Sequence, residues 1–393
     1  MAEAAEAVRP RPRPRSGLLV ALLGLAGLAP SAAAADDLNT ERGRVLTLVG
    51  PVKDLTSQKI VLQPLESDVG LVFVRDHREP GARSLRLHFT VENDTAPPSW
   101  ALKVKDCGGK EVWSAAPSDG VGTAFWSDEI PGDRAKVEVY STTRSNPVQI
   151  SIDRVAIRND KVDPLSITGR RNDLKSIRGQ DAWIVEDGRA VARLRFVADS
   201  GGLFSCTAFL VTRDLLLTNQ HCIATDSERD SALVDFDYDT DRLAHKPARL
   251  KELAHTSFAL DYALVRMQKP ADRDALKLDT SPAPDGEHLL VIQHPAGEPK
   301  QVSLRDCVVD GPSVKGREHP DTDFGHQCDT MTGSSGSPVF RLETRTVVGL
   351  HHLAYDQGAL FNRAVHIQRV LCDLPSALRT EIEAGPPVPC PSP

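Results

Sequence analysis

The sequence predicts an all-β protein built from two successive β-rich regions. In residues 84–92, apolar and polar side chains alternate one by one, which is typical of a strand with one face on a core and the other in solvent. The same alternation recurs in residues 100–105, 136–139 and 148–153, and turn signals rich in Gly, Pro, Asn and Asp separate these segments. In the second half of the chain, short apolar runs alternate with turns and helical periodicity is scarce.

The first region is expected to be a small β-sandwich at residues 36–165, because its alternating strands must cover a common core. Its solvent-facing side could bind carbohydrate or protein, and a spacer or a chaperone-like pro-region is the alternative. Residues 166–188 are polar and charged, which predicts a linker, and its basic residues make it a candidate processing site.

The second region is expected to span residues 189–384, followed by a Pro-rich tail at 385–393. Many short strands with turns between them favour barrels or a sandwich. Strands are predicted at Val191–Val197, Cys206–Val211, Leu215–Thr218, Ala232–Phe236, Tyr262–Met267, Leu289–Ile292, Pro338–Phe340, Thr346–Leu350 and Asn362–Ile367. Helices are predicted at 367–371 and 376–383.

The first 35 residues have the parts of an export signal. Four arginines between residues 9 and 15 precede an apolar run at 17–29, and an Ala-rich segment at 31–35 fits a signal cleavage site. The apolar run is too short to span a bilayer as an ordinary helix, although a short membrane anchor is the alternative. We therefore expect a secreted or periplasmic protein without a membrane-spanning segment after signal removal.

Composition and cysteine usage narrow the function classes. The 393 residues carry a formal net charge of −7, so the chain has no basic surface suited to nucleic acid. All seven cysteines follow the predicted signal, and an oxidising compartment makes disulfides the expected state. Zinc is the alternative, but no C-x-x-C or H-x-x-x-H pair occurs. The odd number leaves at least one thiol unpaired or bridged to another chain.

The segment Asp329-Thr-Met-Thr-Gly-Ser-Ser-Gly-Ser-Pro338 contains two serines, Ser334 and Ser335, between two glycines. Glycines allow a tight, exposed turn that aims a hydroxyl and two backbone N–H groups at one point. An acyl-transfer nucleophile needs this geometry, so Ser335 is the candidate nucleophile and the amides of Gly333 and Ser335 are the candidate oxyanion hole. A Ser/Gly-rich loop without chemistry is the alternative.

Two further residues complete a candidate triad. His221 ends an apolar strand and precedes Cys222, and a Cys206–Cys222 bridge would tether the histidine loop to the preceding strand. A general base must be held in this way within reach of its proton donor. Asp261 lies in an apolar run, where an unpaired carboxylate is costly, so it is expected to pair with His221.

Each of these residues also has an alternative interpretation. A lone histidine is usually structural or on the surface, and Asp261 could merely cap the start of a strand. The rival carboxylates alternate along one face of a strand and are expected to be solvated: Asp235, Asp237 and Asp239. His294 and His352 are expected to be structural.

Five motifs resemble the chymotrypsin/trypsin-like serine peptidases. Thr218-Asn-Gln-His-Cys222 resembles T-A-A-H-C, Asp261-Tyr-Ala-Leu264 resembles D-I-A-L, and Gly333-Ser-Ser-Gly-Ser-Pro338 resembles G-D-S-G-G-P. The last motif, together with Gly349-Leu-His351 and Asn362-Arg-Ala-Val365, is similar to the bacterial glutamyl endopeptidase branch. The resemblance covers about residues 190–370. It implies two six-stranded β-barrels with the site between them, and it assigns the triad to His221, Asp261 and Ser335.

The sequence departs from the family at the residue before the nucleophile, which is Ser334 rather than aspartate. The trypsin-type activation ion pair needs that aspartate, so we expect no zymogen switch of that kind. The substrate pocket stays open between two interpretations with opposite charge preference. Asp329 matches the position that binds Lys or Arg, whereas Thr330 and His351 match the positions that bind an acidic side chain.

The other cysteines are expected to pair as Cys307 with Cys328, beside the nucleophile segment, and as Cys372 with Cys390, which leaves Cys107 single. The sequence thus predicts an exported serine endopeptidase that acts on proteins or peptides without metal or cofactor. A catalytically silent relative, or a binding protein acting through residues 36–165, is the alternative. Oligomeric state is not predicted.

Overall fold

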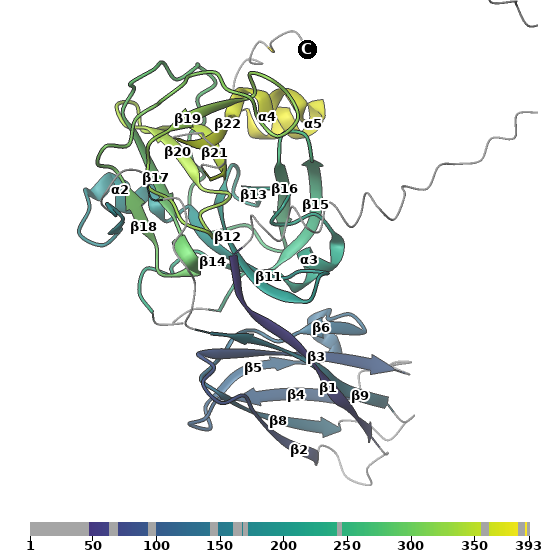
Figure 1. The fold of residues 1–393 in the computed structure, drawn as a ribbon. Helices are drawn as coiled ribbons and strands as arrows, with labels where there is room; N and C mark the ends of the chain where they lie inside the picture. Colours follow the sequence, from purple (N-terminus) through teal and green to yellow (C-terminus); the bar gives the residue numbers. More distant parts are fainter. Residues whose placement is uncertain are drawn as a thin grey trace, which may run out of the picture. The chain divides into compact units, whose positions relative to one another are not determined.

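Figure 1 shows the fold in a computed structural model, which describes residues 47–62, 70–92, 100–141, 148–159, 167, 172–241, 246–354, 361–383 and 390. These residues all belong to one compact unit, Glu41–Pro393. The predicted export signal at 1–35 lies outside the described residues, and only Cys390 of the predicted tail is described. Most described elements are strands, so the all-β prediction is confirmed.

Two sheets make up the first β-rich region. One has the order β1-β9-β3-β6, with β7 also paired to β3, and the other has the order β2-β8-β4-β5. Buried side chains from both sheets, among them Phe89 and Val139, share one apolar core, which is the arrangement of a β-sandwich. The strands are β1 (Thr47–Leu62), β2 (Gly70–Arg78), β3 (Ser84–Glu92), β4 (Trp100–Lys105), β5 (Glu111–Ala115), β6 (Ala124–Trp126), β7 (Ile130–Pro131), β8 (Arg134–Ser141) and β9 (Val148–Arg158), with the short 3-10 helix η1 (Pro117–Asp119).

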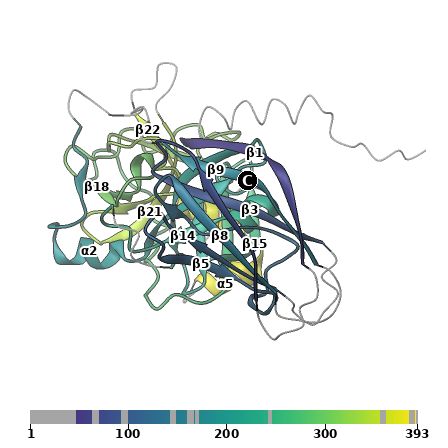
Figure 2. The same ribbon diagram turned by 90° about the horizontal axis from the view of Figure 1, so that it is seen from below.

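Strand β1 belongs to both β-rich regions. Its first residues, Thr47–Pro51, pair with β12 of the second region, and residues 52–62 pair with β9 of the first. Figure 2 shows β1, β9 and β3 side by side, as their pairing requires. Gly50 lies where a Cβ would be 1.6 Å from the Ile157 carbonyl oxygen, so only glycine lets the two backbones approach here.

Six strands form the first sheet of the second region: β11 (Val191–Val197), β12 (Gly202–Leu210), β13 (Leu215–Thr218), β14 (Leu233–Asp235), β15 (Leu250–Ser257) and β16 (Tyr262–Met267). They pair in the order β15-β16-β13-β12-β11-β14, and a bridge between Val234 and Ala248 joins β14 back to the residues before β15. This return makes a closed barrel, which leaves few unpaired edges.

A second set of six strands follows: β17 (Leu289–Gln293), β18 (Gln301–Ser303), β19 (Asp323–His326), β20 (Pro338–Arg341), β21 (Thr346–Leu353) and β22 (Asn362–His366). They pair in the order β18-β17-β20-β21-β22-β19, and the bridge Val309–His326 joins the residues after β18 to β19. The 3-10 helix η2 (Pro295–Gly297) lies between β17 and β18. Two six-stranded units therefore stand where the resemblance implied two barrels.

The predicted linker at 166–188 differs from the structure over its second half. Residues Lys175–Ser176 form β10, which pairs with β18, and Ala182–Gly188 form helix α2. Ile177 and Ile184 are buried in the core of the second region, so apolar burial orders a segment whose composition is mostly polar. The remaining helices are α3 (Asp226–Ser231), α4 (Ile367–Asp373) and α5 (Ser376–Ile382).

Three disulfides are present: Cys206–Cys222, Cys307–Cys328 and Cys372–Cys390. They confirm the three predicted pairs, and Cys107 is a free, exposed thiol. Bridges of this kind fit an oxidising compartment. Among the described helices, none has the length and apolar character needed to cross a bilayer.

Candidate active site

His221 lies three residues beyond the end of β13, where the chain leaves the first barrel. Cys222 is bonded to Cys206 on β12, so the disulfide fixes the loop that carries the imidazole. The ring Nδ1 lies 2.8 Å from Asp261 Oδ2, and the backbone N–H of His221 donates to Asp261 Oδ1 at 3.1 Å. Only 1% of the His221 surface is exposed. The predicted pairing of His221 with Asp261 is therefore present in the structure.

Asp261 occupies a tight turn directly before β16. Its φ of 52° is in the left-handed region, which aspartate tolerates better than most residues. Its backbone N–H donates to the Phe258 carbonyl at 3.2 Å, and the Asn219 side-chain amide donates to the Asp261 carbonyl at 2.9 Å. The turn aims a fully buried carboxylate at the imidazole of His221.

Asp261 has two cationic partners that the sequence analysis missed. Arg317 Nη1 donates to Asp261 Oδ1 at 3.1 Å, and His352 Nδ1 lies 3.1 Å from Asp261 Oδ2. Burial alone would raise the pKa of Asp261, but its interactions with His221 and His352 outweigh burial and hold the pKa well below its usual range. The carboxylate is therefore ionised at neutral pH.

The loop that carries Ser335 is docked on β12. The Thr207 N–H donates to the Ser335 carbonyl at 2.8 Å, and Gly336 has a φ of 88° and lies where a Cβ would be 1.9 Å from the Thr207 carbonyl oxygen. A side chain at residue 336 would push the loop off the strand. Since Thr207 follows Cys206, and Cys206 is bonded to Cys222, the serine loop and the histidine loop are tied to the same two residues of β12.

Two backbone amides in this loop are free to bind an anion. Gly333 has a φ of 90°, and a Cβ there would meet backbone atoms of Ala296 and Gly297 at 3.0 to 3.1 Å. Within the described residues, neither the Gly333 nor the Ser335 N–H donates a hydrogen bond. Donors of this kind beside a serine hydroxyl suit a developing oxyanion.

The candidate substrate-pocket residues are all buried but differ in their partners. Asp329 Oδ2 accepts a hydrogen bond from the Asp173 N–H at 2.7 Å. Thr330 Oγ1 is buried without a hydrogen-bond partner among the described residues. His351 Nδ1 lies 3.2 Å from His326 Nε2, a histidine on β19 that the sequence analysis did not single out.

The prediction that Asp235 is solvated is wrong. Asp235 Oδ2 accepts hydrogen bonds from Arg195 at 2.7 Å and from Arg193 at 3.1 Å, and both guanidinium groups are buried. Burial alone would raise the pKa of Asp235, but the two arginines outweigh it and lower the pKa to about 2. Asp235 does lie in an alternating pattern, but both faces of this strand meet the protein interior. The face that carries Asp235 is therefore not solvated. Asp237 is exposed, as predicted.

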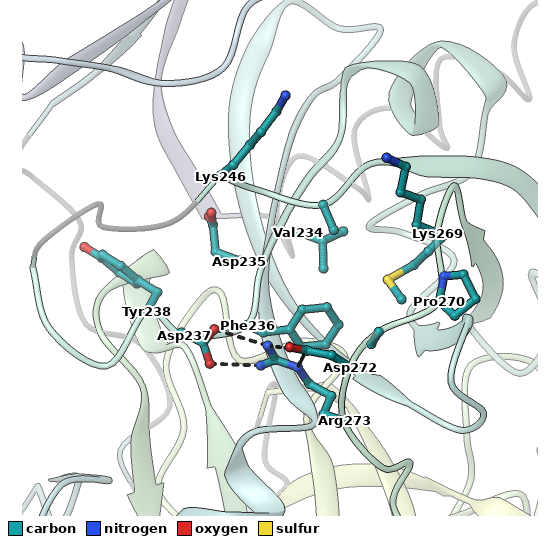
Figure 3. Close-up of a pocket in the computed structure, with 13 residues that line it drawn as sticks. Val234, Asp235, Phe236, Asp237, Tyr238, Lys246, Lys269, Pro270, Asp272 and Arg273 are labelled. Atoms are coloured by element: carbon teal, nitrogen blue, oxygen red, sulfur yellow. Dashed lines mark hydrogen bonds and ion pairs between the residues drawn. The ribbon is translucent and has the colours of Figure 1, made fainter. Parts of the chain in front are cut away.

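Figure 3 shows a cavity of about 250 Å³ beside Asp235, lined by residues 234–238 and by side chains such as Lys246 and Lys269. Arg273 at its edge is bound to Asp237, with 2.9 Å between Nη1 and Oδ1. None of His221, Asp261 and Ser335 lines this cavity, so it is separate from the candidate active site.

One group of side chains has the composition of a metal site, namely Cys206, His221 and Cys222, whose ligand atoms lie within 4.8 Å of one another. The two sulfurs are bonded to each other, so this group offers no thiolate pair to an ion. The chemistry that the site can perform therefore rests on the imidazole, the hydroxyl and the amides.

A family model matches within the second β-rich region. Residues 206–350 match the family model of the trypsin-like peptidase domain. A curated relative, secreted RxLR effector protein 73 of Plasmopara viticola, is 30% identical over 201 residues, which are 47% of this chain and 49% of the relative. The uncharacterized protein y4fB of Sinorhizobium fredii (strain NBRC 101917 / NGR234) is 31% identical over 197 residues, 45% of this chain and 30% of that protein. The chain thus matches half or less of each relative's length.

Among solved structures, the active form of the Rv3671c protease from M. tuberculosis is 18% identical with a TM-score of 0.40, and the alignment covers 58% of this chain and 97% of that one. The HtrA-type protease AlgW with tripeptide is 17% identical with a TM-score of 0.40, covering 51% of this chain and 62% of that one. Neither comparison singles out the glutamyl endopeptidase branch.

Proposed function

We propose that the protein is a serine protease, and more specifically an exported endopeptidase acting through an acyl-enzyme, because residues 206–350 match the family model of the trypsin-like peptidase domain. Its substrates would be proteins or peptides. The contact between His221 and Asp261, in a loop tied to the same strand as the Ser335 loop, is the observation that carries the proposal.

Each residue has one chemical role in the proposed mechanism. Ser335 Oγ attacks the carbonyl carbon of the scissile peptide bond while His221 Nε2 accepts the hydroxyl proton. Asp261 holds the His221 ring with Nδ1 protonated and stabilises the imidazolium that forms. The amides of Gly333 and Ser335 bind the oxygen that becomes negative. His221 then gives its proton to the leaving amine, and water releases the acyl group by the same steps in reverse.

Casein hydrolysis by the exported full chain tests this proposal. We expect activity in the wild type and its loss in Ser335→Ala and His221→Ala, by about 10⁴-fold or more, because each removes a member of one catalytic unit. Cys107→Ser is the matched control, since this exposed thiol lies outside the candidate site. A wild-type protein that is folded and mature but inactive, or a Ser335→Ala variant as active as the wild type, would support the silent-relative alternative.

For the P1 residue we propose an acidic side chain. Burial lowers the pKa of His351 and, together with His352, lowers the pKa of His326 to about 3, so both rings are neutral at pH 7. An incoming carboxylate would favour protonation of this pair and could accept from the Thr330 hydroxyl. The Asp329 carboxylate, by contrast, is already bound to the Asp173 N–H.

Cleavage of a mixed peptide library distinguishes the two charge preferences. We expect cleavage after Glu or Asp, with kcat/KM for these residues falling when Thr330 is changed to Val. Cleavage after Lys or Arg would instead assign the specificity to Asp329.

A further inference from the structure

His352 lies between two buried carboxylates. Its Nδ1 is 3.1 Å from Asp261 Oδ2, and its Nε2 is 2.6 Å from Asp323 Oδ2 on β19. All three side chains are at most 1% exposed. Ionised carboxylates only accept hydrogen bonds, so a ring that contacts one carboxylate through each nitrogen must carry a proton on both. The geometry therefore describes an imidazolium.

The carboxylate of Asp261 is saturated by donors. Oδ1 accepts from the His221 backbone N–H and from Arg317, and Oδ2 lies within hydrogen-bond distance of the His221 and His352 rings. A carboxylate offers about four lone-pair sites, and all four are used here. Neither oxygen can turn away from His221 without breaking other contacts.

Charge supports the same conclusion. With His221 neutral, the ionised Asp261 and Asp323 balance the cations His352 and Arg317. Without the proton on His352, this buried group would carry one uncompensated negative charge, which is costly in a site of low dielectric constant.

The strand β21 explains how one segment serves two sides of the site. His351 meets His326 while the next residue, His352, meets Asp261, at a point where the register of β21 against β22 shifts. The His351 carbonyl also accepts the Gly336 N–H at 2.9 Å, next to the candidate nucleophile. Any shift of β21 would therefore move the serine loop and the support of Asp261 together.

We propose that His352 is a positioning residue of this active site, held as an imidazolium by Asp323 so that it fixes and neutralises the carboxylate that orients His221. The proposal rests on the proposed peptidase function. Burial alone would lower the pKa of His352, but Asp323 and Asp261 outweigh it and raise the pKa to about 9. Among the described residues, the other titratable or charged groups that face His352, Asp261 or Asp323 are His221, Arg317, His326, His351 and His366.

The test is the rate at which diisopropyl fluorophosphate modifies Ser335 of the full chain, measured from pH 5 to 11. This probe needs no knowledge of the natural substrate. In the wild type we expect the rate to fall as pH rises through about 9, when His352 loses its second proton. His352→Asn should lower the rate about 10- to 100-fold at pH 7.5 and abolish this alkaline limb, since misplacement of a catalytic group has effects of this size.

Asp323→Asn keeps the histidine and removes one of its two carboxylates. The alkaline limb should then move down by about one to three pH units, the usual effect of an opposite charge at this distance. His319→Gln is the matched control, because His319 is an exposed histidine near Arg317 in sequence, and its rate and profile should equal those of the wild type.

A second measurement does not depend on catalysis. In ¹⁵N-histidine-labelled Ser335→Ala protein at pH 7, the His352 nitrogens should both show the protonated signature. A neutral His352, or an Asp323→Asn profile that superimposes on the wild type, would overturn the positioning role while leaving the peptidase proposal intact. A wild-type protein that is never modified at Ser335 would instead overturn the proposed function.

Discussion

Two of the largely buried aspartates in the second β-rich region, Asp235 and Asp261, have partners that differ in kind. Asp235 is held by Arg193 and Arg195, and Asp261 is held by two histidines and Arg317. A guanidinium keeps its proton at any pH a protein survives, whereas an imidazole can gain or lose one near neutrality. The arginine-held carboxylate can only maintain structure, but the histidine-held carboxylate can control where a proton resides.

A second contrast lies in the backbone that carries each aspartate. Asp235 ends the regular strand β14, while Asp261 has the left-handed φ of a tight turn. Unusual backbone conformations persist where surrounding contacts fix them, and they cluster at functional sites. Here the Asn219 amide and the Phe258 carbonyl fix the turn.

The largest expected effect separates the two aspartates by activity. Asp261→Asn should lower kcat for casein by about 10⁴-fold per folded molecule, because the neutral amide no longer selects the Nδ1-protonated form of His221. Asp235→Asn should leave kcat per folded molecule within about threefold of the wild type, since Asp235 contacts none of the triad. The folded fraction of each variant is measured by near-UV circular dichroism, which does not depend on the triad. Equal losses in the two variants would remove the distinction.

Asp235 should matter more for stability than it does for activity. Asp235→Asn removes one of the two carboxylates that the buried guanidinium groups of Arg193 and Arg195 share, the other being Glu129. Losing these charged hydrogen bonds should cost about 1.5–3 kcal/mol. Urea unfolding of the Ser335→Ala protein, which cannot digest itself, measures the loss. Asp199→Asn, at an exposed position that follows β11, is the matched control and should change the free energy of unfolding by less than about 1 kcal/mol.

The disulfide that joins the histidine loop to β12 should affect both stability and activity. Replacing Cys206 and Cys222 together with alanine should cost about 2–4 kcal/mol of stability. It should also lower kcat more than it changes KM, because His221 loses its tether. The Cys372→Ala/Cys390→Ala variant is the control, since that bridge lies outside the candidate site. An activity loss equal in both variants would mean that the tether has no special role.

The smallest expected effect is in the pH dependence of stability. The pKa of Asp235 is lowered in the folded state, so its contribution is present above the ordinary aspartate value and is lost as pH falls through about 2. The pKa of His352 is raised, so its contribution is complete below the ordinary histidine value and is lost as pH rises through about 9. The contribution is on the order of 2 kcal/mol for Asp235 and on the order of 3 kcal/mol for His352. Thermal unfolding of Ser335→Ala protein, with Asp235→Asn and His352→Asn added singly, should lose the acid and alkaline slopes respectively.

The sequence predicts the features that local interactions determine, and it misses those that depend on contacts between residues far apart in the chain. Strands β11, β13 and β16 begin and end at the predicted residues, because their apolar runs and bounding turns are local signals. Strand β15 was not predicted, since Lys251, Glu252 and His255 interrupt its pattern and its pairing with β16 decides its conformation. The buried Ile177 and Ile184 were likewise hidden among polar neighbours.

The residues of the candidate site fall into the same two groups, those with a local sequence signal and those without one. His221, Asp261 and Ser335 stand out because each has a local setting that suits its role. His352, Arg317 and Asp323 have no such setting, and their convergence on Asp261 depends on how β19 and β21 pack beside the turn that precedes β16. The one available signal was a pair of adjacent histidines in an otherwise apolar strand, Gly349-Leu-His-His-Leu353, where burial of polar rings requires partners.

The most direct test of the triad is a comparison of casein hydrolysis by Ser335→Ala, His221→Ala and the double variant. If the two residues act as one unit, the double variant will be no slower than the slower single variant, and all three will share the same small residual rate. Losses that multiply in the double variant would mean that serine and histidine act independently, and would contradict the account.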